Sequence, residues 1–250
     1  MAEERVVSAC LVIIGNEILS GRTQDANLAY LAKELNELGI RMREARVIPD
    51  DEAVIVETLN ELRPRFDYVF TTGGIGPTHD DITSACVAKA FGLGFGRHPE
   101  AERRLRAYYP PEKLNDARLK MAETPEGAEL IDNPVSVAPG FRVENVYVLP
   151  GVPSIMRAMF DGLRPSLRGG TPVRSRSITV YCPEGEVAKP LGEIQARHPE
   201  VEIGSYPFMR QDRFGTTLVF RSPDHGRIDE AAGELLAFTQ ARRIEVQEIF

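Results

Sequence analysis

Strand patterns and helix patterns alternate three times in roughly the first 90 residues, and this alternation constrains the fold more than any other feature. The strand patterns lie at residues 6–14, 40–48 and 67–70, and the helix patterns at residues 25–38, 49–64 and 83–91. The first strand pattern is a nearly continuous run of apolar, β-branched residues, which is typical of a strand buried on both faces. The alternation therefore predicts an α/β fold with a parallel sheet between two layers of helices, joined by right-handed crossovers.

The rest of the chain predicts a second, smaller domain. A Pro- and Gly-rich polar segment at residues 164–172 has the composition of a linker. Before it, strand patterns at residues 129–131, 141–143 and 146–149 and a helix at 154–163 complete the first domain. After it, strands at 176–182, 201–206 and 216–221 and helices at 187–197 and 228–242 follow the order β-α-β-β-α. We therefore predict a three-layer domain at residues 1–168 and a small α+β domain at residues 173–250.

Composition limits the partners and the location of the protein. The formal net charge of −7 argues against nucleic acid as a partner. The three cysteines lie far apart, as expected of apolar core residues in a reducing compartment. The apolar run after the first few residues stops at Gly15 and is too short for a signal peptide or a membrane span. We expect a cytoplasmic protein with no membrane contact.

The most informative loop is the glycine-rich segment at residues 71–83, which follows the third strand pattern and leads into a helix. Glycines 73, 74 and 76 let the backbone approach a ligand closely, and their amides, with the positive end of the next helix, suit an anion. Asp80 and Asp81 at the helix start would repel a phosphate unless a divalent cation lies between them. The loop predicts a phosphate-bearing ligand held by amides, with a metal on the aspartates.

A structural interpretation of this loop is the alternative. Gly-Gly turns are common after strands, Asp is an ordinary helix cap, and the spacing fits neither a P-loop nor a dinucleotide fingerprint. Ligands of parallel sheets, however, bind beyond the carboxyl ends of the strands. Residues 15–21, 49–50 and 72–81 all lie at such ends and carry glycine or carboxylate. This convergence favours the ligand-binding interpretation.

Residues 99–120 form a polar, Arg-rich helical stretch that is broken at Pro110 and Pro111. Its basic residues are Arg103, Arg104, Arg106, Arg118 and Lys120. They can touch a ligand or a neighbouring subunit, but a run of charges on a helix is typical of a solvated face, and that is our interpretation.

Five motifs resemble, in order and spacing, the molybdopterin-binding-like domain of the CinA (competence/damage-inducible protein A) family. They lie at residues 15–21, 25–27, 48–51, 71–83 and 149–153, and the resemblance covers about residues 6–165. The domain is similar to molybdenum-cofactor enzymes and to the amino-terminal domain of eukaryotic FAD synthases. Residues 203–207 resemble the small KH-like domain of CinA-type proteins. No stretch resembles the deamidase domain of many relatives, so that activity is not expected.

The resemblance implies a metal-dependent nucleotide pyrophosphatase that hydrolyses ADP-ribose or FAD-like substrates and releases AMP. It implies a divalent metal (Mg, Mn or Co) together with K⁺. The alternative is a molybdopterin-binding protein, or a molybdenum-cofactor biosynthesis module, without pyrophosphatase turnover. A third possibility, an adenylyltransferase acting on molybdopterin, is disfavoured by the CinA-like small domain. The partner is therefore a small nucleotide or pterin phosphate, and relatives imply a homodimer, with a trimer as the alternative.

The resemblance also implies roles for particular residues. Asp81 matches the catalytic aspartate and is the first choice for the metal, Asp50 is the second, and Asp80 is a third ligand or a cap. Glu17 acts as a base or is simply a polar loop residue, and His79 is expected to be exposed to solvent. The predicted phosphate- or nucleotide-binding residues are Thr72, Gly73, Gly74, Ile75, Gly76, Thr78, Gly15, Asn16, Asn27 and Gly151. Asn16 departs from the pattern, because relatives frequently have an acidic residue there.

Overall fold

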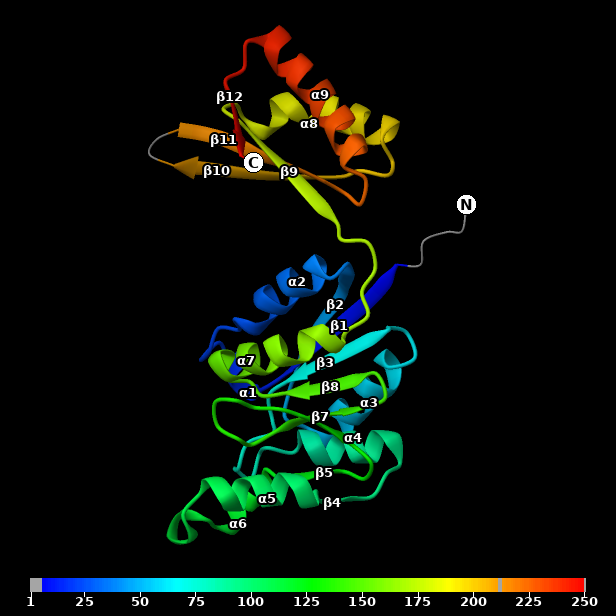
Figure 1. Ribbon diagram of the computed structural model, residues 1–250. Helices are drawn as coiled ribbons and strands as arrows, with labels where there is room; N and C mark the ends of the chain where they lie inside the picture. The colour runs from blue at the N-terminus through cyan, green and yellow to red at the C-terminus, as the bar shows by residue number, and fades with distance from the viewer. Residues whose placement is uncertain (1–5, 211–212, 250) are drawn as a thin grey trace. The chain divides into compact units, whose positions relative to one another are not determined.

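The computed structural model describes residues 6–210 and 213–249 (Figure 1). The residues that precede Val6 lie outside this range. The chain divides into two compact units, Met1–Gly170 and Thr171–Phe250, each with a core of its own. No helix in the described part of the chain is long and apolar enough to cross a membrane.

The first unit is built on a six-stranded sheet with the order β2-β1-β3-β8-β7-β6. The strands are β1 (Val7–Ile14), β2 (Ile40–Ile48), β3 (Tyr68–Thr72), β6 (Glu129–Ile131), β7 (Gly140–Val143) and β8 (Val146–Leu149). The pairs β1–β2, β1–β3 and β3–β8 are parallel, which confirms the predicted parallel sheet. The pairs β6–β7 and β7–β8 are antiparallel. For β7–β8 the cause is the connection, because only Glu144 and Asn145 join the two strands and such a short turn reverses the chain.

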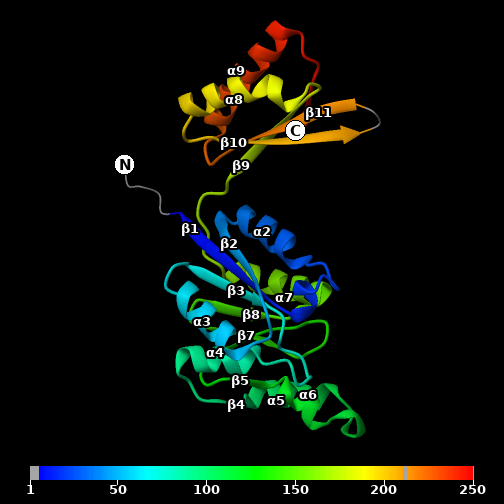
Figure 2. The ribbon, with the colours of Figure 1, turned by 180° about the vertical axis from the view of Figure 1, so that it is seen from behind.

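Helices cover both faces of this sheet, as predicted. Two helices, α2 (Asn27–Glu37) and α7 (Pro153–Leu163), pack on the face that carries Leu11 and Phe70. Two others, α3 (Glu52–Leu62) and α4 (Thr83–Phe91), pack on the face that carries Val12 and Val69. The two views show these layers on either side of the sheet (Figures 1 and 2). A short helix, α1 (Asn16–Leu19), follows β1 directly.

A group of small elements follows α4 and gathers beside it in both views (Figures 1 and 2). It contains α5 (Pro99–Tyr108), a 3₁₀ turn η1 (Pro111–Lys113) and α6 (Asp116–Lys120), where the sequence predicts one helix broken at its prolines. It also contains a ribbon that the sequence does not predict, in which β4 (Phe95–Arg97) pairs antiparallel with β5 (Glu123–Pro125). We call this pair the β4–β5 ribbon.

The second unit is a four-stranded antiparallel sheet with the order β10-β11-β9-β12 and two helices, which confirms a smaller second domain. Another 3₁₀ turn, η2 (Arg164–Ser166), closes the first unit before it. The elements are β9 (Arg174–Val180), α8 (Glu184–Arg197), β10 (Glu202–Arg210), β11 (Arg213–Ser222), α9 (His225–Arg242) and β12 (Val246–Ile249). Helix α8 begins before the predicted Val187 and continues through Pro190, although proline removes one helical hydrogen bond. Strand β12 is absent from the sequence prediction.

Candidate functional site

The loops that follow β1, β3 and β8 meet at the carboxyl edge of the sheet. The Gly73 amide donates to the Leu149 carbonyl oxygen at 3.1 Å. A Cβ added to Gly73 would overlap the carbonyl oxygen of Ile14, and one added to Gly151 would lie 3.4 Å from the Gly73 Cα. The approach of Gly73 to Ile14 is possible only because Gly73 has no side chain, whereas the space at Gly151 would accept a Cβ in ordinary contact. The structure therefore brings together the glycines that the sequence singles out on three separate loops.

Positive φ angles shape the turn into α4. Gly73 has a φ of 105° and Gly74 a φ of 67°. The Thr83 amide donates to the Gly74 carbonyl oxygen at 3.0 Å, and a Cβ on Gly74 would overlap the Thr83 hydroxyl oxygen. Thr83 is fully buried, and its hydroxyl has no hydrogen-bond partner within the described residues. Within the described residues, the Thr83 hydroxyl thus lies against the backbone of Gly74 without a hydrogen-bond partner.

The acidic end of the loop folds back on Thr78. One carboxylate oxygen of Asp81, Oδ2, accepts from the Thr78 amide at 2.8 Å and from the Thr78 hydroxyl at 2.5 Å. Asp80 is exposed, and hydrogen bonding from Thr78 and from its own backbone holds its pKa below the usual value, so it is ionised at neutral pH. The Lys120 ammonium donates to the Thr78 carbonyl oxygen. A lysine from α6 therefore lies against the predicted phosphate loop.

A small cavity of about 100 Å³ opens at the start of α4. Its charged lining residues are Asp81, Lys120 and Glu123, and the other walls come from residues 75–76, 82 and 84–85 and from Phe95. Amides in the first turn of a helix have no partner within the helix, and they point along the positive end of its dipole. With the Lys120 ammonium beside them they suit a phosphate-sized anion, whereas the Asp81 carboxylate favours a cation at the same place.

Other predicted residues lie at the neighbouring strand ends. The Asn16 amide donates to Asp50 Oδ2 at 2.9 Å, and the Gly15 amide donates to the Ile48 carbonyl oxygen at 3.1 Å. The Glu17 carboxylate is exposed and folds over Gly15, since a Cβ on that glycine would lie 2.6 Å from Glu17 Oε1. Asp50 therefore uses one oxygen to fix the start of α1, and Glu17 lies over the end of β1.

Asn27 joins α2 to the loop after β8. Its amide nitrogen donates to the Gly151 carbonyl oxygen at 2.9 Å, and the residue is only 3% exposed. Its Oδ1 has no hydrogen-bond partner among residues 6–210 and 213–249. The amide nitrogen is thus committed to holding the loops together, and its oxygen is the atom left for a ligand.

The predicted metal ligands do not form a ready-made metal site. Within the described residues, no group of three His, Cys, Asp or Glu side chains is placed to hold a metal ion. Asp50 and Asp81 each hold a different backbone amide, and His79 is 98% exposed, as expected. Two of the residues that line the small cavity, Asp81 and Glu123, carry carboxylates, and oxygen ligands of this kind suit a hard cation such as Mg²⁺.

Sequence reasoning missed three residues at this site. Lys120 reaches the Thr78 carbonyl oxygen in an exposed contact, which the interpretation of a solvated face did not anticipate. The hydroxyl of Thr83 and the ring of Phe95, which also lines the small cavity, were not singled out. By contrast, Arg103 and Arg106 pair with glutamates one turn away on α5, as expected of a solvated face.

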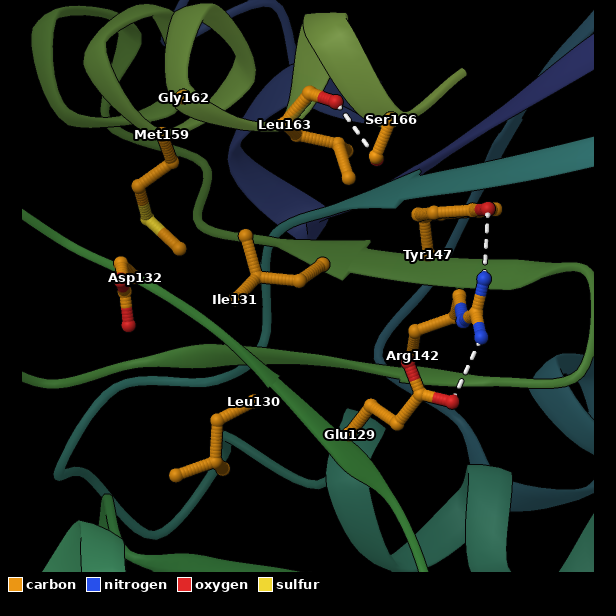
Figure 3. A pocket seen from close by; sticks show the side chains of 10 residues that line it. All are labelled: Glu129, Leu130, Ile131, Asp132, Arg142, Tyr147, Met159, Gly162, Leu163 and Ser166. Atoms are coloured by element: carbon orange, nitrogen blue, oxygen red, sulfur yellow. Dashed lines mark hydrogen bonds and ion pairs between the residues drawn. The ribbon is translucent and has the colours of Figure 1, made fainter. Parts of the chain in front are cut away.

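Another cavity, of about 290 Å³, lies over β6, β7 and β8 beside the end of α7 (Figure 3). Arg142 donates to Glu129 at 2.6 Å and to the Tyr147 hydroxyl at 3.3 Å, so its charge is paired. The chain beyond α7 is fixed near the start of β3, where the Arg168 amide donates to the Tyr68 hydroxyl at 2.8 Å. The side of the cavity that is formed by the end of α7 is therefore near the amino edge of the sheet, away from the glycine-rich loop.

The comparisons with known proteins agree with this architecture. Residues 10–169 match the family model described as probable molybdopterin binding domain, and residues 172–248 match the model described as FAD synthase, middle domain. A CinA-like protein from Syntrophus aciditrophicus is 38% identical over 221 residues, covering 83% of this chain and 53% of that protein. A protein described as a probable FAD synthase from Caenorhabditis briggsae is 32% identical over 244 residues, covering 86% of this chain and 46% of that protein.

A solved structure shares the first unit. The crystal structure of CinA from Thermoplasma acidophilum, described as a protein with unknown function, is 34% identical and superposes with a TM-score of 0.60. The match covers 64% of this chain and 96% of that chain. The chain thus spans nearly all of this solved relative, but only about half the length of the CinA-like and FAD synthase relatives described above.

Proposed function

This chain belongs to the CinA-like family, and from that membership we propose that it is a metal-dependent nucleotide pyrophosphatase that hydrolyses ADP-ribose, FAD or a related dinucleotide and releases AMP. The observation that carries the proposal is the cavity at the start of α4. There, residues of the first turn of α4 line the same space as Lys120 and as the acidic residues Asp81 and Glu123. A pyrophosphate and its cation need this combination of donors and an acidic ligand.

Each group has a role in the cleavage of the P–O–P bridge. The amides of the loop and of the first turn of α4 bind the phosphate oxygens, and Lys120 offsets the charge that develops on them. The Asp81 carboxylate, with Asp50 and Asp80 at the same edge, is the group that would hold a divalent cation. Such a cation supplies charge neutralisation and acidifies a bound water. Water adds to one phosphorus as the bridge to the other breaks, and the exposed Glu17 carboxylate accepts the proton.

The test is AMP release from purified protein. ADP-ribose, FAD and NAD are each incubated with Mg²⁺, Mn²⁺ or Co²⁺ in the presence of K⁺, and AMP is measured by chromatography. We expect AMP from at least one substrate, and only when a divalent metal is present. Metal-independent release would contradict the roles given to the aspartates.

Asp81→Asn tests the acidic group directly. Asparagine keeps one oxygen that can accept from the Thr78 amide, so the loop should stay folded while the charge is lost. We expect kcat/KM to fall by about 100-fold or more, with an unchanged circular dichroism spectrum. Asp229→Asn in α9 of the second unit removes an exposed carboxylate elsewhere and should keep full activity. Full activity in Asp81→Asn would eliminate its proposed role.

A molybdopterin-binding protein without turnover is the second candidate. Two observations favour it: the description of the matched family and the lack of a three-ligand metal group in the described part of the chain. It predicts no AMP from any substrate and metal. In that case titration with molybdopterin should show saturable binding that Gly74→Ala weakens, because the added Cβ would overlap Thr83 in the loop.

A further inference from the structure

Phe95 lines two cavities of the first unit. It lines the small cavity at the start of α4 and also a larger one of about 430 Å³ over the β4–β5 ribbon. The larger volume lies in the range of sites that hold small organic ligands. Phe95 therefore borders both cavities, and the smaller one is the predicted phosphate site.

The ring of Phe95 is unusually accessible for a large apolar side chain. It is 44% exposed, although it lies within a strand and pairs with Pro125. The backbone around it leaves room, since a Cβ added to Gly96 or Gly127 would meet no atom within 4 Å. The Glu126 side chain covers Gly94 on the other side of Phe95, so the open approach to the ring is over Gly96 and Gly127.

Among the polar residues that line the larger cavity, His98 can supply a hydrogen-bond donor. His98 Nδ1 accepts from the amides of Glu100 and Ala101 at 3.2 and 3.4 Å, where it caps α5. An imidazole that accepts at Nδ1 carries its proton on Nε2, so the Nε2–H is the remaining donor of a ring that lines this cavity. The neighbouring Arg97 is already paired with Asp116 at 3.3 Å.

We propose that the β4–β5 ribbon is the base subsite of a nucleotide-binding site. Phe95 stacks on the heteroaromatic ring of a nucleotide, His98 donates to an acceptor on that ring, and the nucleotide's phosphate occupies the cavity at the start of α4. This inference rests on the phosphate site of the proposed function and names the part of the ligand that it recognises. A π-face next to a phosphate site selects a nucleoside phosphate over a sugar phosphate.

Binding of two probes to the full chain tests the inference. AMP carries the ring and ribose 5-phosphate lacks it, and both are titrated calorimetrically in the presence of Mg²⁺. We expect Phe95→Ala to weaken AMP binding by about 10-fold and to leave ribose 5-phosphate binding unchanged. Phe95→Tyr should restore AMP binding, and Phe214→Ala, an exposed phenylalanine of β11, should change neither probe.

Three outcomes would overturn the inference. They are the absence of AMP binding to the wild type, unchanged AMP affinity in Phe95→Ala, and an equal loss for both probes. The proposed function is judged separately, because this measurement needs no turnover. A protein that cleaves no dinucleotide but binds AMP through Phe95 refutes the pyrophosphatase and supports the subsite. A protein whose Phe95→Ala variant cleaves its dinucleotide with an unchanged KM refutes the subsite alone.

Discussion

Gly73 and Gly76 belong to the same motif, but the structure gives them different constraints. A Cβ on Gly73 would overlap the main-chain oxygen of Ile14, which lies in a buried strand and has no room to move. The atoms nearest to a Cβ on Gly76 would be those of the Asp81 side chain, whose Oδ2 would lie 2.7 Å away. The first glycine is therefore required by the fold of the sheet edge, and the second by the position of the Asp81 carboxylate.

Gly73→Ala should consequently destabilise the first unit severely. We expect the free energy of unfolding to fall by about 3 kcal/mol, because the substitution combines a positive φ with an overlap that the strand cannot relieve. Gly21→Ala is the matched control, since Gly21 also has a positive φ of 71° but is surrounded by open space. It should cost about 1 kcal/mol. Urea unfolding followed by circular dichroism measures both, and equal costs would contradict the role given to Ile14.

The sequence predicts the local part of the candidate site and misses the part that is assembled by folding. Glycines, carboxylates and the strand before them lie within one short segment, so their spacing alone indicates a ligand loop. Lys120 reaches Thr78 from 42 positions away, and its own neighbours in sequence form an ordinary charged stretch. The chain around Phe95 likewise carries no ligand-binding pattern. Such residues are recognised only when the tertiary structure places them against the loop.

At the scale of elements, a clear local pattern of apolar residues decides what can be predicted. The helix at Thr83–Phe91 and the strands at Ile40–Ile48 and Val146–Leu149 have the predicted bounds, because each has a continuous apolar or alternating pattern and a clear end. The strands β4 and β5 have three residues each, which is too few to show a period, and their sequences Phe-Gly-Arg and Glu-Thr-Pro carry no apolar run such as the Leu-Ile pair that marks β6. Their pairing depends on a partner more than twenty positions away, and that information is absent from the local sequence.

The junction of α8 and β10 depends on one side chain that propensities do not reveal. Gln195 Nε2 donates to the carbonyl oxygens of His198 and Val201 at 3.2 and 2.6 Å, and its Oε1 accepts from the Ile203 amide at 3.0 Å. Gln195 therefore satisfies three backbone groups in the turn between the helix and the strand.

Gln195→Ala should loosen this junction. We expect a loss of about 2 kcal/mol in the second unit, because the three backbone groups lose their partner in a half-buried turn. Hydrogen exchange should become faster at the amide of Ile203, which donates to Gln195. Gln240→Ala, at an exposed position of α9, is the control and should change stability by less than about 0.5 kcal/mol. Unaltered exchange at Ile203 would show that the side chain does not hold the turn.

On the scale of the whole molecule, the two units have separate cores. The buried residues of the first unit form clusters that contain Cys10 and Cys86, and those of the second unit form a cluster that contains Cys182. Burial raises the pKa of Cys10 to about 12 and that of Cys86 to about 11, and it also raises the pKa of Cys182. All three thiols should be unreactive in the native protein at about pH 8, because the thiolate is the reactive form.

The three cysteines can therefore report the unfolding of each unit separately. Pulse alkylation across a urea series, read by mass spectrometry, should modify Cys182 at a lower urea concentration than Cys10 and Cys86, which should react together. The reason is size: a smaller unit buries a smaller fraction of its surface and is less stable. Separate transitions would show that the units unfold independently, so that site variants such as Gly73→Ala perturb only the first. Modification of all three thiols in one transition would mean that the units unfold as one, and the unfolding free energies of single variants would then belong to the whole chain.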